Sequence, residues 1–195
     1  MLKLRIFLLS GFIFFLNVSS QCQNLDTRIL RAINSSNTKY DKIWLAITKS
    51  ATPIAIASPI AIYSMGAYHK NVNEKRQAFV NVGAFAINTV VTVGLKWGID
   101  RERPFVSDPL IYQKTSAESP SFPSGHTSLA FTTATSLTLA YPKWYVALPA
   151  YAWASAVGYS RMHLGVHYPS DVLAGAIIGT LSSFLAYGIN KQMVK

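Results

Sequence analysis

Three short polar segments interrupt an otherwise apolar chain, and together they hold residue types suited to phosphate chemistry. The segments are KWGIDRERP at 96–104, PSFPSGHTS at 120–128 and SRMHLGVHYPSD at 160–171. Arginine guanidinium groups match phosphate oxygens in pairs, and the start of a helix offers unpaired backbone N–H groups to an anion. Histidine titrates near neutral pH and can transfer a proton or a phosphoryl group. The combination predicts a pocket for a tetrahedral oxyanion.

The individual residues divide into a binding set and a reacting set. The candidate phosphate-binding residues are Lys96, Arg103, Ser124, Gly125 and Arg161. The candidate catalytic residues are His126, His167 and Asp171. Asp171 follows His167 by four residues, so its carboxylate could hold the imidazole in one tautomer and stabilise its positive form, as in a catalytic triad.

Simpler interpretations exist for each of these residues taken alone. PSFPSGHTS also suits a plain loop between helices, and a lone lysine at a helix end commonly snorkels to the membrane surface. Three separate segments with complementary chemistry are not expected on that basis. Two further histidines receive no catalytic role: His163 is expected to pack or line a rim, and His69 to lie at the opposite end. Residues 100–102 are expected to form a solvated loop face.

The composition indicates a small helical membrane protein. Half of the 195 residues are hydrophobic and 13% are charged, about half the charged fraction of an average soluble domain. The net charge is +10, but the cations form no basic run, so we expect an anionic substrate or a membrane surface rather than nucleic acid as partner.

Five long apolar stretches would form the core helices of an all-α, membrane-embedded bundle. They cover about 48–68, 77–97, 126–140, 144–160 and 171–190. Such lengths approach the ~30 Å of a hydrocarbon core, and the many small residues favour close helix packing in lipid. The threonine-rich segment 128–140 is the weakest as a spanning helix and is expected to be shielded by its neighbours. A soluble helical bundle is the alternative.

The N-terminus resembles a secretory signal. Lys3 and Arg5 precede an apolar run that is short for a membrane span, and cleavage after Ser20 is expected. Residues 1–20 are therefore a predicted signal peptide, with an uncleaved anchor as the alternative. Residues 21–47 form a predicted amphipathic segment, helical over 25–46, and 48–195 the bundle domain. Cys22 is the single cysteine, which excludes an internal disulfide.

Alternate threading of the five stretches places all three polar segments outside the cytoplasm. The opposite ends then carry Lys70, Lys75, Arg76, Lys143, Lys191 and Lys195. Lysine and arginine are enriched in short cytoplasmic segments, so this orientation is the favoured one. We therefore expect a protein of the bacterial inner membrane whose site faces the periplasm.

The spacing K-x6-R-P, P-S-G-H and S-R-x5-H-x3-D resembles the three-part signature of the type 2 phosphatidic acid phosphatase family, which includes bacterial acid phosphatases and vanadium haloperoxidases. The resemblance covers about 77–190. It implies that His167 attacks phosphorus to give a phosphohistidine, that Asp171 orients it, and that His126 protonates the leaving oxygen and then activates water. It also implies that the five binding residues hold the phosphate and that no metal or other cofactor is required.

The leading hypothesis is a metal-independent phosphatase that acts on a membrane lipid phosphate or diphosphate. The first alternative is a secreted, soluble acid phosphatase that acts on small phosphomonoesters; the uncharged helix lengths disfavour it. A vanadium-dependent haloperoxidase would use the same anion pocket and is disfavoured by the short chain. A non-catalytic membrane scaffold is disfavoured by the presence of both histidines and the aspartate. The sequence does not choose the lipid.

Overall fold

The computed structural model describes residues 25–193, and within them all regular structure is helical. Residues 25–33 are helical. The later helices are α2 (Asp41–Lys49), α3 (Ala51–Tyr68), α4 (Val72–Ile99), α5 (Pro104–Ser107), α6 (Gly125–Ala140), α7 (Trp144–His163) and α8 (Pro169–Met193). The predicted signal peptide and Cys22 lie outside the described residues.

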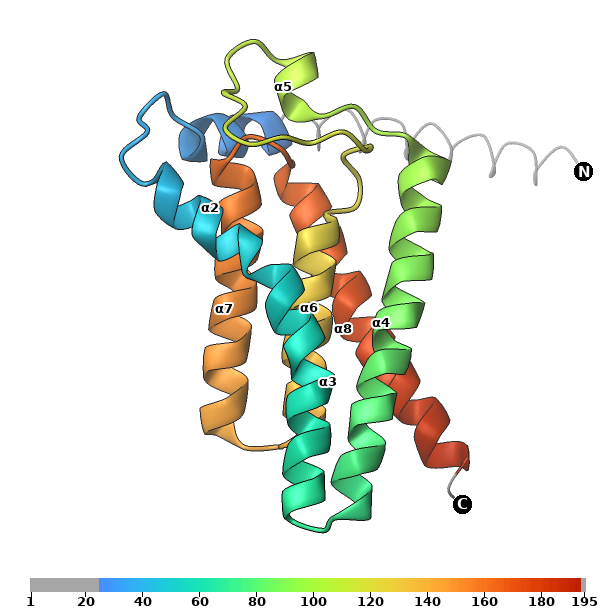
Figure 1. Cartoon of the computed structure of the whole chain (residues 1–195). Coiled ribbons are helices and arrows are strands. Elements are labelled where there is room, and N and C mark those ends of the chain that lie inside the picture. The colour runs from blue at the N-terminus through green and yellow to red at the C-terminus, as the bar shows by residue number, and fades with distance from the viewer. Residues whose placement is uncertain (1–24, 194–195) are drawn as a thin grey trace, which may run out of the picture.

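The five long helices α3, α4, α6, α7 and α8 form one bundle, which confirms the predicted all-helical fold (Figure 1). Helix α6 is the central one and packs against α3, α4, α7 and α8. Its buried residues are Thr127, Ser128, Ala130, Thr132, Thr133, Ala134, Thr135 and Ser136. A threonine-rich helix suits this place because threonine hydroxyls can bond to carbonyls of their own helix, as Thr132 does to Ser128 (2.8 Å).

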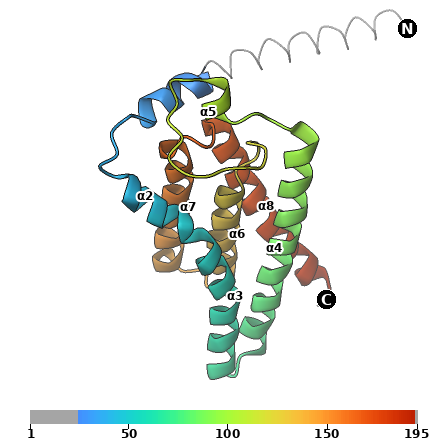
Figure 2. The same ribbon diagram turned by 45° about the horizontal axis from the view of Figure 1, so that its top comes forward.

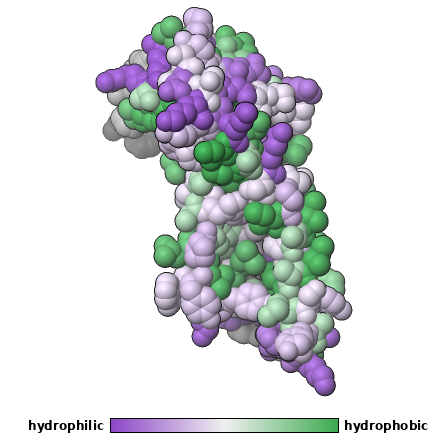
Figure 3. Space-filling model, turned by 60° about the vertical axis from the view of Figure 1, so that its left-hand side comes forward, coloured by the Kyte–Doolittle hydropathy of each residue, from purple (hydrophilic) through white to green (hydrophobic). Residues whose placement is uncertain are grey.

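Three helical stretches of the described chain are long and apolar enough to cross a membrane: Asp41–Tyr68, Val72–Ser107 and Pro169–Met193. We expected five. Helix α6 has 16 residues, or about 24 Å at 1.5 Å per residue, and its neighbours shield it. Helix α7 has 20 residues and is long enough, but it is not apolar enough to count among the membrane-spanning candidates. On the face shown in Figure 3, apolar side chains occupy the body of the bundle and hydrophilic ones gather at its ends.

The segments that connect the long helices lie at the two ends of the bundle. The 25–33 helix and the long connection around α5 cover one end, uppermost in Figures 1 and 2. The α3–α4 turn, the α6–α7 turn and the C-terminal end of α8 lie at the other. All three polar segments of the sequence therefore reach the same end.

The prediction of one helix over 25–46 was wrong. The chain leaves the helical conformation after Ile33, and α2 begins only at Asp41. The Asn34 side chain explains the interruption, because it bonds to distant backbone: its Oδ1 accepts from the Tyr112 N–H (2.7 Å) and its Nδ2 donates to the His163 carbonyl (2.8 Å). These two bonds hold Asn34 beside the α5 connection and the end of α7, and the chain turns there instead of continuing the helix.

Close packing of α8 on α6 depends on a missing side chain. A Cβ on Gly175 would lie 2.6 Å from the Ser124 carbonyl oxygen, which real contacts do not allow. Glycine therefore lets the start of α8 approach the start of α6. Since α6 begins in one polar segment and α8 begins in another, this contact brings the two segments together.

Candidate active site

Asp171 lies in the first turn of α8, fully buried, and its carboxylate is held on both sides. Oδ2 accepts from the Ser121 hydroxyl (2.6 Å) and from the Tyr168 N–H (2.9 Å). The second bond resembles half of a capping box, in which an acidic side chain near the helix start bonds to the N-cap N–H. Oδ1 accepts from Arg101 Nη1 (2.7 Å). The Asp171 carbonyl also accepts from the Ser124 N–H (3.0 Å), which fastens α8 to α6.

His167 precedes α8 in the short α7–α8 connection, and it is 2% exposed. Its Nδ1 lies 3.6 Å from Asp171 Oδ2, and its Nε2 lies 3.4 Å from Arg103 Nη1. The first distance is beyond a hydrogen bond, so Nδ1 is close to the carboxylate without being bonded to it. Burial, assisted by the positive charges of Arg161 and Arg103, lowers the pKa of His167 to about 3 against the opposing pull of Asp171. The ring is therefore neutral at ordinary pH.

Two cations from the first polar segment bond to the chain just ahead of α6. Lys96, in the last turn of α4, donates to the Pro120 carbonyl. Arg103 donates from Nε to the Ser119 carbonyl (2.8 Å) and from Nη1 to the Val166 carbonyl (2.7 Å). The second bond joins Arg103 to the residue directly before His167.

The PSGH segment forms the start of α6. Ser124 is the N-cap and fully buried, and its hydroxyl lies 2.8 Å from that of Thr127. Gly125 stands beside Lys96: a Cβ placed there would lie 4.0 Å from Lys96 Cε. The first N–H groups of a helix have no partner within it, so this end can receive an anion next to a cation.

Arg161 enters the same region from α7 and is 4% exposed. Its Nη1 donates to the Thr48 hydroxyl (2.9 Å) at the end of α2. Among the described residues its Nε finds no acceptor. A buried guanidinium with an unused N–H is suited to an incoming phosphate oxygen.

His126 shares its surroundings with His167. Both imidazoles lie within electrostatic range of Arg103 and Arg161, and Lys96 also acts on His126. The structure thus brings all eight candidates into one region at one end of the bundle. Their roles stay predictions.

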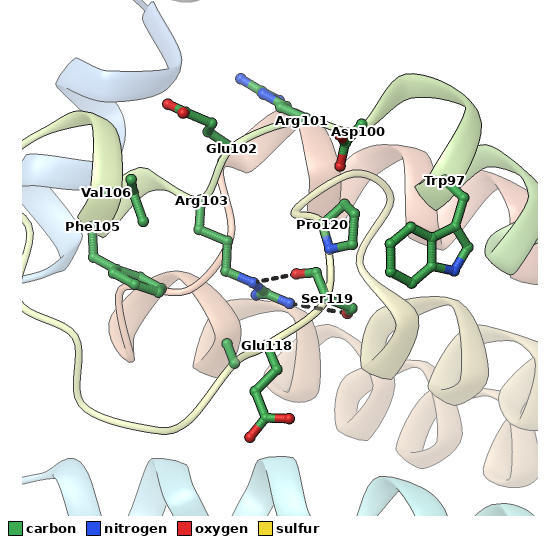
Figure 4. A pocket seen from close by; sticks show the side chains of 11 residues that line it. Trp97, Asp100, Arg101, Glu102, Arg103, Phe105, Val106, Glu118, Ser119 and Pro120 are labelled. Atoms are coloured by element: carbon green, nitrogen blue, oxygen red, sulfur yellow. Dashed lines mark hydrogen bonds between the residues drawn. The ribbon is translucent and has the colours of Figure 1, made fainter.

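An open pocket of about 360 Å³ adjoins this region and has Arg103 in its wall. Figure 4 shows Trp97, Phe105 and Pro120 around it, with the Arg103 guanidinium bonded to Ser119. The acidic residues Asp100, Glu102 and Glu118 also line it. The pocket gives solvent access to one side of Arg103.

One expectation for the first segment was wrong: Arg101 does not belong to a solvated face. Its side chain is 21% exposed and forms ion pairs with Asp171 and Asp26. Sequence reasoning also missed Ser121 and Thr48, which bond to Asp171 and Arg161 respectively. For Arg101 the only available signal was a cation two residues before Arg103 in a segment that also held a predicted site residue.

The other two histidines lie where the sequence suggested. His163 is buried at the end of α7, with Nε2 2.8 Å from Asp41, whose same oxygen accepts from Lys114 (2.8 Å). This cluster fastens α2 to α7. His69 lies in the α3–α4 turn at the opposite end, 3.1 Å from Glu74. Within residues 25–193, no three His, Cys, Asp or Glu side chains gather in a way that could hold a metal ion.

Comparison with known proteins now identifies the fold and motifs. A sequence profile of the PAP2 superfamily matches residues 77–194, which is more than half of the chain. The chain belongs to the PAP2 superfamily. The superfamily match includes all three polar segments.

Relatives within the superfamily have names that refer to lipid phosphates. An undecaprenyl-diphosphatase of Sulfolobus acidocaldarius is 36% identical over 107 residues, 54% of this chain and 52% of the relative. A lipid A 4'-phosphatase of Bacteroides thetaiotaomicron is 40% identical over 72 residues, 37% of this chain and 32% of the relative. The matches therefore span about half and about a third of these relatives. Undecaprenyl-diphosphatase BcrC of Bacillus subtilis is 24% identical, over 82% of this chain and 80% of the relative.

Two solved structures share the architecture. The transmembrane PAP2-type phosphatidylglycerolphosphate phosphatase of Bacillus subtilis superposes with a TM-score of 0.70 at 27% identity, covering 94% of this chain and 96% of that one. LpxE of Aquifex aeolicus gives a TM-score of 0.71 at 24% identity, covering 83% and 93%. The fold is thus that of transmembrane PAP2 phosphatases.

Proposed function

We propose that this chain is a membrane-embedded phosphatase that hydrolyses a lipid phosphate or diphosphate through a phosphohistidine intermediate. One observation carries the proposal: a buried, neutral imidazole, His167, lies between the Asp171 carboxylate and the Arg103 guanidinium. Two further cations, Lys96 and Arg161, lie within electrostatic range of this group. A neutral nucleophile beside fixed positive charge suits attack on a phosphate anion.

His167 attacks with Nε2. Its Nδ1 is the nitrogen near Asp171, so the ring proton belongs there and the Nε2 lone pair is free. As the Nε2–P bond forms, negative charge grows on the equatorial phosphate oxygens and positive charge on the ring. The guanidinium groups of Arg103 and Arg161 offset the first, and Asp171 offsets the second.

His126 acts first as the general acid and then as the general base. Burial and the charges of Arg161, Arg103 and Lys96 lower the pKa of His126 to about 4, so its acid form depends on the negative charge of the bound phosphate beside it. In the first step the bond from phosphorus to the leaving oxygen breaks, and His126 in this acid form gives its proton to that oxygen. In the second step water adds to phosphorus, neutral His126 accepts a proton from it, and the P–Nε2 bond breaks. Phosphate leaves, and both imidazoles return to their starting states. The mechanism needs no metal ion.

The membrane setting favours a lipid substrate. The site lies at one end of a bundle with three membrane-spanning candidates, where a lipid headgroup reaches the cations while its tail stays in the bilayer. The cation-bearing turns at the opposite end favour a site that faces the periplasm of a bacterial inner membrane. The names of the relatives favour undecaprenyl diphosphate or lipid A phosphates over other lipids.

The direct test is phosphate release by the purified full chain in detergent. The panel contains undecaprenyl diphosphate, lipid A, phosphatidylglycerol phosphate, phosphatidate and a water-soluble phosphomonoester, each with and without EDTA. The proposal predicts chelator-insensitive release from at least one lipid, lost in His167→Ala. Release from the soluble ester alone would support a soluble acid phosphatase instead, and carbonate extraction of membranes would then wash the protein off.

A further inference from the structure

Arg101 and Asp26 form a link that runs from the 25–33 helix to the candidate catalytic carboxylate. Arg101 Nη1 donates to Asp171 Oδ1 (2.7 Å), and its Nη2 donates to Asp26 Oδ2 (2.9 Å). One guanidinium thus bridges two carboxylates that are 5% exposed or less and lie far apart in the chain. The Arg101 guanidinium also lies over the Tyr168 ring, 4.0 Å from its centroid. The planar fork of arginine suits such a bridge.

Besides its ion pair with Arg101, Asp26 bonds to Ser170 at the start of α8. Its Oδ1 accepts from the Ser170 N–H (3.0 Å), and its Oδ2 accepts from the Ser170 hydroxyl. That hydroxyl in turn accepts from Arg101 Nη1 (2.7 Å). Asp26 is therefore linked to the Asp171 carboxylate in two ways. It bonds to Ser170, the residue directly before Asp171 in the chain, and it bonds to Arg101, which bonds to the Asp171 carboxylate.

This arrangement decides which oxygen of Asp171 meets His167. A fully buried carboxylate is costly unless it is paired. Arg101 holds Oδ1, while Ser121 and the Tyr168 N–H hold Oδ2, so the carboxylate is kept from rotating and Oδ2 stays on the side of His167 Nδ1. Arg101 supplies the only charged partner in this set. Three of the five N–H groups of Arg101 are already engaged, by Ser170, Asp171 and Asp26, which disfavours it as a phosphate ligand in this position. Its side chain also leaves the backbone on the opposite side from Arg103 (Figure 4).

We propose that Asp26 and Arg101 are positioning residues: Asp26 orients Arg101, and Arg101 fixes Asp171 for its contact with His167. The inference rests on the proposed phosphatase function. It also makes the 25–33 helix, which precedes the matched superfamily region, a working part of the active site. Small displacements of a catalytic group can lower rates by about 10²-fold, so such a link would be visible in kcat.

A double-mutant cycle on the full chain tests the link, with phosphate release from the best lipid of the panel as readout. Arg101→Gln is expected to lower kcat by about 10²-fold and Asp26→Asn by about tenfold. The double variant is expected to lose clearly less than the product of the two single losses, since part of the effect of Asp26 passes through Arg101 and the rest through Ser170. Multiplied losses would overturn the proposal. Arg101→Lys keeps one charge near Asp171 and is expected to recover part of kcat, whereas equality of the Lys and Gln variants would indicate a packing role only.

A matched control separates positioning from simple docking of the helix. Arg31, on the same helix, pairs with Asp108 (2.7 Å) and has no bond to α8. Arg31→Gln is expected to leave kcat within about twofold of wild type, and a loss equal to that of Asp26→Asn would overturn the proposal. If Asp26→Asn does not fold, Ser170→Ala replaces it: a loss of about threefold that disappears in the Arg101→Gln background supports the link, and a persistent loss contradicts it. A wild type no more active than His167→Ala would instead refute the phosphatase function itself.

Discussion

Two histidine–carboxylate pairs lie at opposite ends of the bundle, and the closer pair is the one without a proposed role. His69 Nδ1 is 3.1 Å from Glu74, with the two side chains 43% and 18% exposed. His167 Nδ1 is 3.6 Å from Asp171, with the two side chains 2% and 0% exposed. Distance within the pair therefore does not distinguish a reactive histidine. His167 differs from His69 in its burial, in the arginines that lie close to it and in the fixed partners of its carboxylate.

The largest contrast is expected from removing each histidine in turn. His167→Ala should abolish turnover because the nucleophile is lost, whereas His69→Ala should leave kcat near the wild-type value. Phosphate release by both variants, with thermal unfolding in detergent to verify folding, measures the difference. Near-normal turnover in His167→Ala would break the comparison, and strong loss in His69→Ala would show that the wrong end was chosen.

The second-largest loss of activity is expected from changing His126, at the end of the bundle that holds the candidate site. His126→Ala should lower kcat by about 10²-fold or more, the usual contribution of a general acid. The loss should be smaller for a substrate with a good leaving group, such as a nitrophenyl phosphate, because its leaving oxygen needs no proton. Equal losses for good and poor leaving groups would remove the assignment of His126 as the acid.

A third comparison uses two glycines of α8, one at each end. Gly175→Ala places a Cβ against the Ser124 carbonyl and should cost about 1–3 kcal/mol of stability, with loss of activity. Gly188→Ala meets open space and should be neutral or stabilise by up to about 1 kcal/mol. Thermal midpoints in detergent measure both. Equal effects would show that the α6–α8 contact does not organise the site.

The smallest expected effect is a pH dependence of stability. Burial lowers the pKa of His167 from 6.5 to about 3, so between these values the unfolded chain binds more protons than the folded one. Stability is then complete above pH 6.5 and falls with acidification, by about 1 kcal/mol per pH unit. His167→Gln lacks this contribution, and its unfolding midpoint should change less between pH 7 and pH 5. A parallel decline in both proteins would place the cause elsewhere.

Much of the fold was predictable because helix ends carry local signals. The stretches expected at 126–140 and 144–160 became α6 (Gly125–Ala140) and α7 (Trp144–His163). Proline, glycine and charge mark these boundaries. The polar run NSSNT at 34–38 is typical of a loop and could have indicated the break, whereas the groups that hold Asn34, Tyr112 and His163, lie far away in the chain.

The candidate site residues could be proposed from their types and spacing, but the residues that pair with them could not. The ordered motifs predicted His167 and Asp171 as site residues, and the structure brings the two together, yet Arg101 appeared to belong with its acidic neighbours Asp100 and Glu102. It pairs instead with Asp26 and Asp171, 75 and 70 residues distant. A buried carboxylate needs a cation, and only the folded chain determines which cation reaches it.

The most direct measurement is capture of the phosphorylated enzyme. Wild-type protein is mixed with a lipid substrate that carries a radioactive phosphate, and the reaction is quenched within milliseconds in alkali, where phosphohistidine persists. Mass spectrometry then identifies the residue that carries the phosphate. The account predicts phosphate on His167, formed and lost at rates that match turnover and absent in His167→Asn. Phosphate on another residue, or full turnover with direct transfer to water and no labelled protein, would contradict it.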